Sequence, residues 1–174
     1  MADWKIDQAH SNIGFEVRHM MVSKVKGSFD SFTSKVKADE LTDLTGADIA
    51  IEIDVNSINT GNKGRDDHLR SGDFFDVESF PTISFQSTKI TSDGDDFKMT
   101  GDLTVRDVTK PVTFDVEFGG KAPMPDGNDV YGFEAETKIN REEFGLTWNA
   151  VLESGGVAVS KDVKIKVEIE VNPA

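Results

Sequence analysis

The sequence predicts an all-β, antiparallel fold in a single domain over residues 1–174, and three observations support this prediction. Apolar and polar residues alternate with a period of two in several segments, turn-forming residues separate those segments, and one stretch near 62–76 breaks the pattern. Alternation of this kind places one face of each strand in an apolar core and the other in water, as antiparallel sheets do. A chain of 174 residues is long enough to bury a substantial core.

The alternation is clearest in three segments, 49–55, 112–118 and 163–171. In the last of these, β-branched residues occupy the odd positions and Lys or Glu the even ones. Weaker copies predict strands at 13–19, 83–89, 97–105 and 131–139. We also expect strands at 3–6 and at 24–37, the latter bent near Gly27.

Turn signals separate these segments. Residues 92–96 predict a short hairpin loop, and residues 119–129 predict a longer polar loop. Residues 106–111 link another pair of strands, with Pro111 expected at a strand start because proline donates no hydrogen bond to a ladder.

The stretch 62–76 predicts a short helix bounded by Gly64 and Gly72. Its fixed charges balance, so a self-paired polar helix is favoured over an anion-binding clamp. These charges are Lys63, Arg65 and Arg70 against Asp66, Asp67 and Asp73. Eight or nine strands with one helical excursion fit a closed barrel or a two-layer sandwich, and the pattern does not choose between them.

Composition excludes several classes of function. The formal net charge is −13, which disfavours nucleic acid as a partner and disfavours unaided docking on an anionic membrane. The absence of cysteine excludes disulfides, thiol nucleophiles and Cys-ligated metals. No apolar run is long enough for a transmembrane segment. No signal peptide is visible at the start, so we expect a cytoplasmic location, or a periplasmic or secreted one if a signal has been removed.

The sequence carries no recognised catalytic motif and no signature of a metal or cofactor site. The histidines His10, His19 and His68 are far apart in the chain without metal-ligand spacing, and His10 is expected to be structural. We therefore expect no catalytic residues, no metal and no cofactor.

The inward parity of the strands is almost entirely apolar. We expect it either to fill a solid core or to line a cavity, since an eight-stranded barrel lies at the boundary between these outcomes. A hollow barrel lined in this way would suit an aliphatic chain. The candidate lining residues are Phe15, Val17, Ile51, Ile53, Phe85, Leu103, Phe114, Phe133 and Ala135.

Two polar residues extend this inward parity and are candidates for a ligand headgroup at the rim. His19 follows Phe15 and Val17, and Arg141 follows the inward positions of 131–139. The alternatives are a half-buried His19 bonded to a backbone carbonyl and an Arg141 paired with Glu142.

Several short motifs, in order along almost the whole chain, resemble the YceI-like family of lipid-binding proteins. They include Trp4-Lys5-Ile6-Asp7, Phe15-Glu16-Val17-Arg18-His19, Val25-Lys26-Gly27-Ser28-Phe29, Arg65-Asp66-Asp67-His68-Leu69-Arg70-Ser71, Asp73-Phe74-Phe75-Asp76, Val108-Thr109-Lys110-Pro111-Val112 and Ile139-Asn140-Arg141-Glu142-Glu143-Phe144-Gly145-Leu146. Arg106-Asp107 stands where many relatives have a glycine, which we expect to change only a turn.

The resemblance implies an extended lipocalin-like antiparallel β-barrel of about eight strands, often a homodimer. Its cavity would bind a polyisoprenoid or another amphipathic lipid. The expected function is therefore non-catalytic lipid binding, sequestration or transport. Two alternatives remain open: an enzyme that holds an apolar substrate and uses His19 with an acid for proton transfer, and an interaction module whose core is filled.

Overall fold

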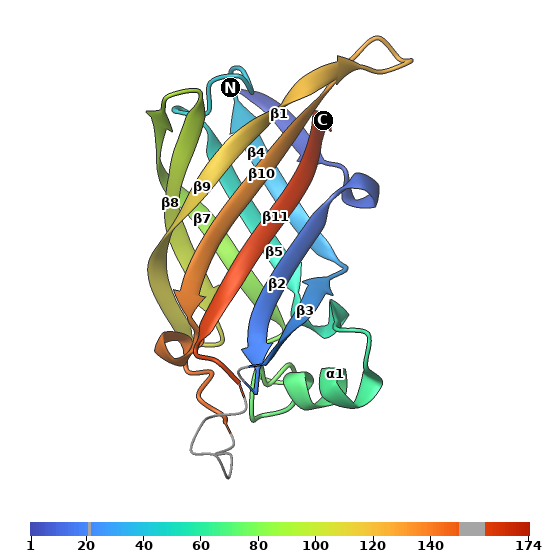
Figure 1. Ribbon diagram of the computed structural model, residues 1–174. Helices are drawn as coiled ribbons and strands as arrows, with labels where there is room; N and C mark the ends of the chain where they lie inside the picture. The colour runs from blue at the N-terminus through green and yellow to red at the C-terminus, as the bar shows by residue number, and fades with distance from the viewer. Residues whose placement is uncertain (21, 150–158) are drawn as a thin grey trace.

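The computed structural model describes residues 1–20, 22–149 and 159–174, which form an elongated antiparallel β-barrel with one α-helix at its lower end (Figure 1). The strands are β1 (Ala2–Ile6), β2 (Asn12–His19), β3 (Ser23–Phe29), β4 (Phe32–Ala38), β5 (Asp48–Asp54), β6 (Ile58–Asn59), β7 (Thr82–Asp93), β8 (Asp96–Val105), β9 (Val108–Pro123), β10 (Asp129–Asn140) and β11 (Asp162–Pro173). The helices are α1 (Lys63–Arg70) and the 3-10 turns η1 (Gln8–His10), η2 (Val55–Ser57) and η3 (Arg141–Phe144).

Eight of these strands close into a ring in the order β1-β4-β5-β7-β8-β9-β10-β11, with β11 returning to pair with β1. The remaining strands β2, β3 and β6 extend the sheet from the other part of β11. The sequence left barrel and sandwich open, and the β1–β11 pairing establishes the barrel that the family resemblance implied.

One edge of β11 is shared by two strands, and a step in register separates them. Ile6 pairs with Val171 and Asn12 pairs with Glu168, so β1 and β2 advance six residues while β11 advances three. The three additional residues form η1, whose N-cap is Asp7. β1 and β2 therefore follow a single edge of β11 with a three-residue excursion between them.

The predicted strand at 24–37 is wrong as one element, because it is two strands with different partners. β3 pairs with β2 and β6, whereas β4 pairs with β1 and β5. Asp30 and Ser31 lie between them and donate their N–H groups to the carbonyl and the hydroxyl of Ser57. The change of partner replaces the bend that we expected near Gly27.

The strand β9 is longer at both ends than the sequence predicted. A two-residue turn, Arg106-Asp107, joins Val105 to Val108, with Arg106 at a positive φ of 54°. Pro111 therefore lies inside β9 and not at its start. The β9–β10 pairing ends at Asp115, so Pro111 lies where β9 has a ladder partner on its β8 side only. At the other end, β9 continues through Pro123 into the region predicted as a loop.

The predicted helix is present, but its start differs from the prediction. Asn62 is the N-cap and accepts a hydrogen bond from the Arg65 N–H at 3.0 Å, so Gly64 lies in the first turn. An asparagine side chain accepts a hydrogen bond from an unpaired N–H group at the helix start, whereas glycine has no side chain to do so. Of the predicted self-pairing, the structure shows the Arg70–Asp67 pair at 3.1 Å, whereas Arg65 and Asp66 bond to Thr60. Within the described ranges, no helix is both long and apolar enough to cross a membrane.

The excursion η1 gives the fold a testable pH dependence. His10 Nδ1 lies 2.8 Å from Asp7 Oδ2, and this hydrogen bond raises the pKa of His10 and lowers the pKa of Asp7. The stabilisation from Asp7 is complete above its ordinary pKa of 3.8 and is lost as the pH falls through its lowered value. The stabilisation from His10 is complete below 6.5 and is lost as the pH rises through its raised value.

We therefore expect the pair to contribute most between pH 3.8 and 6.5. An NMR titration of the His10 ring should give a midpoint above 6.5, and Asp7→Asn should move that midpoint down. An unchanged midpoint in Asp7→Asn would contradict this assignment.

Candidate functional site

The barrel encloses a cavity of about 460 Å³ that runs along its axis. This volume lies within the range of pockets that hold small-molecule ligands. All nine predicted lining residues contact it, as do His19 and Arg141. The interior is therefore hollow, which excludes the reading in which the protein's own side chains fill it completely.

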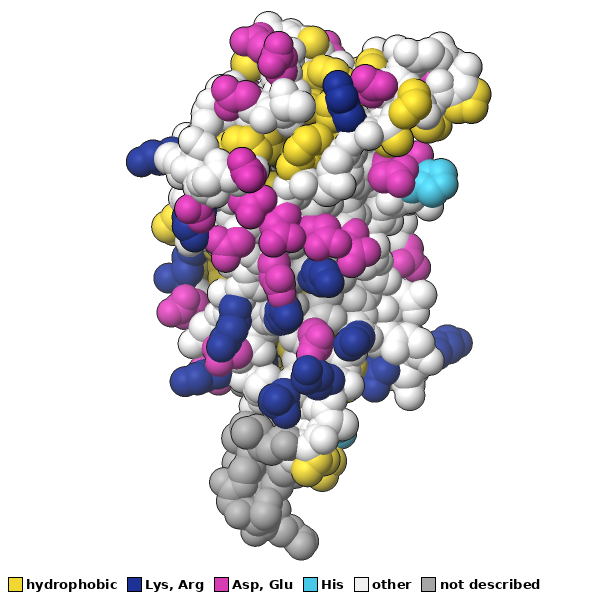
Figure 2. Space-filling model, turned by 45° about the horizontal axis from the view of Figure 1, so that its top comes forward, with side chains coloured by type: hydrophobic (Ala, Val, Ile, Leu, Met, Phe, Trp, Pro, Cys, Tyr) yellow, Lys and Arg dark blue, Asp and Glu magenta, His cyan; other side chains and the backbone are white. Residues whose placement is uncertain are grey.

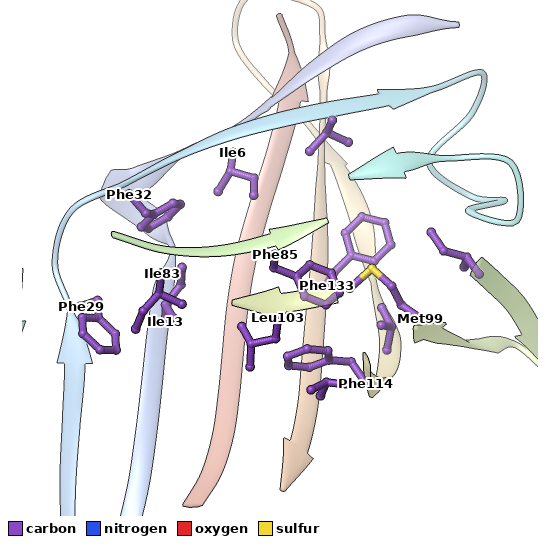
Figure 3. Packing of buried hydrophobic residues seen from close by; sticks show 14 of the residues in the cluster. Ile6, Ile13, Phe29, Phe32, Ile83, Phe85, Met99, Leu103, Phe114 and Phe133 are labelled. Atoms are coloured by element: carbon purple, nitrogen blue, oxygen red, sulfur yellow. The ribbon is translucent and has the colours of Figure 1, made fainter. Parts of the chain in front are cut away.

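The lining residues fall into two groups that differ in burial. Phe15, Val17, Ile51, Ile53 and Ala135 are only partly buried, because their inward faces border the open part of the cavity. The others belong to the packed part of the core, with Phe85, Leu103, Phe114 and Phe133 all buried (Figure 3). The rings of Phe85 and Phe114 meet edge to face at 5.4 Å between centroids. The barrel is thus part solid core and part open space.

Phe15 owes its position in the cavity wall to a glycine on the adjacent strand. Gly27 pairs directly with Phe15, and a Cβ at Gly27 would lie 2.4 Å from Phe15 Cζ. The ring therefore lies over the bare backbone of β3, where any larger residue would displace it.

The two ends of the cavity differ in their contact with solvent. At the upper end, the connection between β4 and β5 closes the barrel with the buried side chains of Leu41 and Leu44. At the lower end, which we call the α1 end, the lining includes the exposed residues His19 and Arg65 (Figure 1). The cavity therefore reaches solvent at the α1 end.

An aromatic cluster covers part of the α1 end. The ring of His68 on α1 makes edge-to-face contacts with Phe74 at 5.1 Å and with Trp148 at 4.7 Å. His68 Nε2 also lies 2.9 Å from Asp73 Oδ2. Neither Phe74 nor Trp148 was among the sequence candidates, although the Asp73-Phe74-Phe75-Asp76 motif marked the position of the first.

Hydrogen bonds to Thr60 hold α1 against this end. The buried carboxylate of Asp66 accepts from the N–H and hydroxyl of Thr60, and Arg65 Nη2 donates to the Thr60 carbonyl at 2.7 Å. Arg70 donates to the carbonyls of Asn56 and Ile58. The charged residues of the helix are thus used mainly to attach it to the barrel.

The expectation that Arg141 lies at a solvent-facing rim is wrong. Its side chain is 3% exposed, and burial lowers its pKa. The guanidinium donates to four backbone carbonyls, those of Leu146 at 2.6 Å, Ser160 at 2.8 Å, Trp148 at 3.0 Å and Val159 at 3.3 Å. This places Arg141 inside η3, where it joins two segments of the α1 end and has little capacity left for a ligand.

His19 lies at the end of β2, as the parity predicted, and forms an isolated bridge with Val159. Its carbonyl accepts a hydrogen bond from the Val22 N–H at 3.2 Å. The three histidines lie on separate elements, β2, η1 and α1. The oxygen and nitrogen atoms of Asp7, His10 and Glu170 do approach within 4.8 Å of one another, away from the cavity.

The polar part of the lining has a single sign of charge. Among the described residues that contact the cavity there is no Asp or Glu, although the chain has 32. The polar contacts are Arg18, His19, Thr60, Arg65, His68 and Arg141. All belong to β2, α1, η3 or the residue just after β6, so the cavity is apolar along its length and basic at the α1 end.

A hollow antiparallel barrel with an apolar interior and one polar end defines the class of small β-barrels that enclose a hydrophobic guest. Residues 4–171 match the YceI-like domain, and the chain belongs to this family. The match spans nearly the whole described fold, from β1 to β11.

Known relatives agree with this assignment. A UPF0312 protein of Staphylococcus aureus is 43% identical over 98% of this chain and 97% of the relative. The crystal structure of the Campylobacter jejuni YCEI protein superposes with a TM-score of 0.78 at 32% identity, covering 97% of this chain and 96% of that one. Burkholderia cenocepacia BcnA shares the fold, with a TM-score of 0.81 at 24% identity over 95% and 98% of the two chains.

Arg141 should be essential to stability. Arg141→Ala would remove a donor from four buried or partly buried carbonyls, of which that of Val159 would keep Asn149 Nδ2, and we expect a loss of about 3 kcal/mol or more in the free energy of unfolding. Urea denaturation measures this loss. Lys161→Ala, an exposed change in the same region, should stay within about 0.5 kcal/mol of wild type. Equal effects of the two substitutions would contradict the structural role of Arg141.

Gly27 should be intolerant of even one methyl group. Gly27→Ala places Cβ against the Phe15 ring, and we expect a destabilisation of about 1–3 kcal/mol. Gly64→Ala is the matched control, because a Cβ there meets nothing closer than 3.5 Å and favours the helix. Thermal denaturation should therefore move the two midpoints in opposite directions.

Proposed function

We propose that the protein binds an amphipathic lipid with one long apolar chain, of the polyisoprenoid or fatty-acyl type, and holds or carries it without chemical change. The observation that carries this proposal is the cavity itself, apolar along the barrel and basic only at the α1 end. An apolar chain would occupy the barrel, and the headgroup would lie at the α1 end.

The free energy of burying an apolar chain is large enough for the chain and the headgroup to have separate roles in binding. Burial of ten to fifteen methylene carbons provides roughly 8–12 kcal/mol before the costs of ordering the ligand. The apolar wall therefore supplies most of the affinity, and polar contacts at the α1 end select the headgroup and fix the orientation of the chain.

The headgroup assignment follows from which polar groups retain free donors. Arg141 has four of its N–H groups committed to carbonyls, so the role that we expected for it passes to its neighbours. His19 is exposed and lines the cavity, and its ring forms no ion pair within the described chain. We assign the first headgroup contact to His19, and the second to Arg65, which also lines the cavity and has Nε and Nη2 bonded to Thr60.

A related fold supports the class of ligand. A protein from Saccharophagus degradans described as a polyisoprenoid binding domain superposes over 100% of both chains with a TM-score of 0.71. At 14% identity this likeness concerns the fold alone, and the apolar lining of the present cavity is the independent argument for a similar guest.

The enzymatic alternative requires an acid to act with His19. In the part of the cavity wall that the structure describes, the ionisable side chains are all basic, so the required carboxylate is not among them. We therefore favour binding over proton-transfer chemistry. Loss of turnover in His19→Ala would reverse this preference.

The direct test is mass spectrometry of an organic extract from freshly purified protein. We expect a lipid in near-stoichiometric amount and chemically unmodified, which an unrelated protein prepared identically lacks. A lipid-free extract from protein that also fails to take up added isoprenoid or fatty-acyl lipids would contradict the proposal.

A bulky residue in the wall should abolish lipid retention. Ala135 lies on the inward face of β10 between Val116 and Val167, so Ala135→Trp would place an indole in the open part of the cavity. Glu136→Trp is the matched control on the outward face of the same strand. We expect the extract of Ala135→Trp to lose at least about 90% of the bound lipid, because the indole would fill the space that the lipid occupies. The extract of Glu136→Trp should keep its lipid.

A further inference from the structure

The turn between β2 and β3 presents apolar side chains to solvent at the α1 end of the barrel. Met20 is 45% exposed and Val22 is 85% exposed. They are two of the four large hydrophobic residues that are exposed in the described part of the chain. The other two, Met1 and Met124, belong to the opposite end, where the N-terminus and the β9–β10 loop lie (Figure 1).

The backbone of this turn would suit a different residue. Met20 has a φ of 53°, in the left-handed region that glycine and asparagine adopt most readily. The Val22 N–H donates to the His19 carbonyl and closes the turn. Methionine at this position is neither required by the turn nor buried by the fold.

Basic side chains surround this tip. Arg18 and Lys24 are paired directly across β2 and β3, although like charges in that position destabilise a hairpin. One step further from the tip, Glu16 pairs with Lys26 on one side and with Lys164 on the other. We call Arg18, Lys24, Lys26 and Lys164 the basic collar. Lys24 pairs with Glu16 at 3.2 Å, which lowers the pKa of Glu16, and Lys164 pairs with Glu136 at 2.6 Å. The four basic residues of the collar outnumber these two acids, so the collar keeps a net positive charge.

The collar is part of a wider separation of charge along the barrel. On the outer face, β10 changes from Glu134 and Glu136 to Lys138 toward the α1 end, and β11 changes from Glu168 to Lys164 in the same direction. Figure 2 shows acidic side chains gathered over the upper part of the visible face and basic ones over its lower part. The chain as a whole is acidic, but the surface around the β2–β3 tip is not.

We propose that the α1 end docks on an anionic lipid bilayer, with Met20 and Val22 entering the interfacial layer and the basic collar contacting the phosphates. An apolar tip within a ring of basic side chains is the arrangement that binds such surfaces. The docked orientation directs the open end of the cavity at the bilayer, which is where a lipid ligand would enter or leave. The proposal runs against the expectation, drawn from the net charge of −13, that unaided docking on an anionic membrane is disfavoured.

The docking face is off-centre toward the β2–β3 hairpin. Exposed acids also lie at this end: Glu142, Glu143 and Asp162 around η3 and the start of β11, and Asp67 and Asp73 on and just after α1. Those around η3 and β11 would be held away from the phosphates by an approach through the hairpin tip. The role that we give to docking, delivery or uptake of a lipid ligand, rests on the proposed function. Binding of the protein to a membrane can nevertheless be measured whether or not the cavity holds a lipid.

The test is flotation of the full-length protein with vesicles of equal parts phosphatidylglycerol and phosphatidylcholine, compared with pure phosphatidylcholine. We expect binding to the anionic vesicles that weakens as NaCl is added. The double variant Met20→Asn, Val22→Ser should reduce this binding at least about tenfold while keeping the fold, because asparagine accepts the left-handed backbone. Met124→Asn, the same change at the opposite end, should leave binding unchanged.

Charge reversal tests the collar separately. Lys24→Glu with Lys26→Glu should reduce binding by more than about 25-fold, since each basic side chain near an anionic surface contributes roughly fivefold. Lys35→Glu with Lys37→Glu makes the same change in net charge at the same spacing on β4, and we expect a much smaller effect. Equal losses from the two pairs would indicate a general charge effect and would overturn the proposal.

Absence of binding to the anionic vesicles would also overturn it. So would binding that survives both the tip and the collar variants. If the tip variant instead dissociated a homodimer in sedimentation experiments without vesicles, with no vesicle binding by the wild type, the surface would be a protein interface. None of these outcomes depends on the lipid content of the extract, so docking and cavity binding can fail separately.

Discussion

The division of one edge of β11 between β1 and β2 is the constraint on which the rest of the structure depends. β1 closes the ring at the C-terminal part of β11, and β2 pairs with its earlier part after a three-residue step. Because β2 then carries β3 and β6 with it, the ring of strands is closed by the β1–β11 pairing toward the upper end, and the strands β2, β3 and β6 extend the sheet toward the α1 end. The upper end is sealed by Leu41 and Leu44, whereas the α1 end is completed by a helix and by side chains.

The irregular segments at the α1 end are held in place by hydrogen bonds of two buried charged residues. Arg141 gathers the carbonyls of two segments that follow η3, around Leu146 and around Ser160, and Asp66 holds α1 to Thr60. Both are polar groups whose burial is compensated by hydrogen bonds, which is the condition for tolerating them in a core. The cavity can thus open at this end without loss of the frame around it.

The strands and the inward faces could be predicted because an apolar interior imposes a period of two whether it is packed or hollow. For the same reason, alternation could not reveal the cavity: Phe15 and Phe85 share one pattern and both contact the cavity, yet Phe15 is only partly buried and Phe85 is buried. Parity also placed Arg141 on the inward side without showing that backbone carbonyls would occupy its donors. The change of partner at Asp30 and Ser31 accompanies a shift in the alternation, from odd inward positions such as Phe29 in β3 to even ones such as Phe32 in β4, which the interpretation of 24–37 as one strand did not take into account.

The place where β9 and β10 separate has a consequence for how the wall responds to strain. Their pairing stops at Asp115, and beyond it Thr137 Oγ1 donates to the Thr113 carbonyl at 2.8 Å in place of a regular ladder. Pro111, which has no N–H to offer, lies in this stretch. A seam with fewer backbone hydrogen bonds yields before the neighbouring ladders do. Transient widening of the barrel would therefore begin between these two strands, beside the end where the cavity meets solvent.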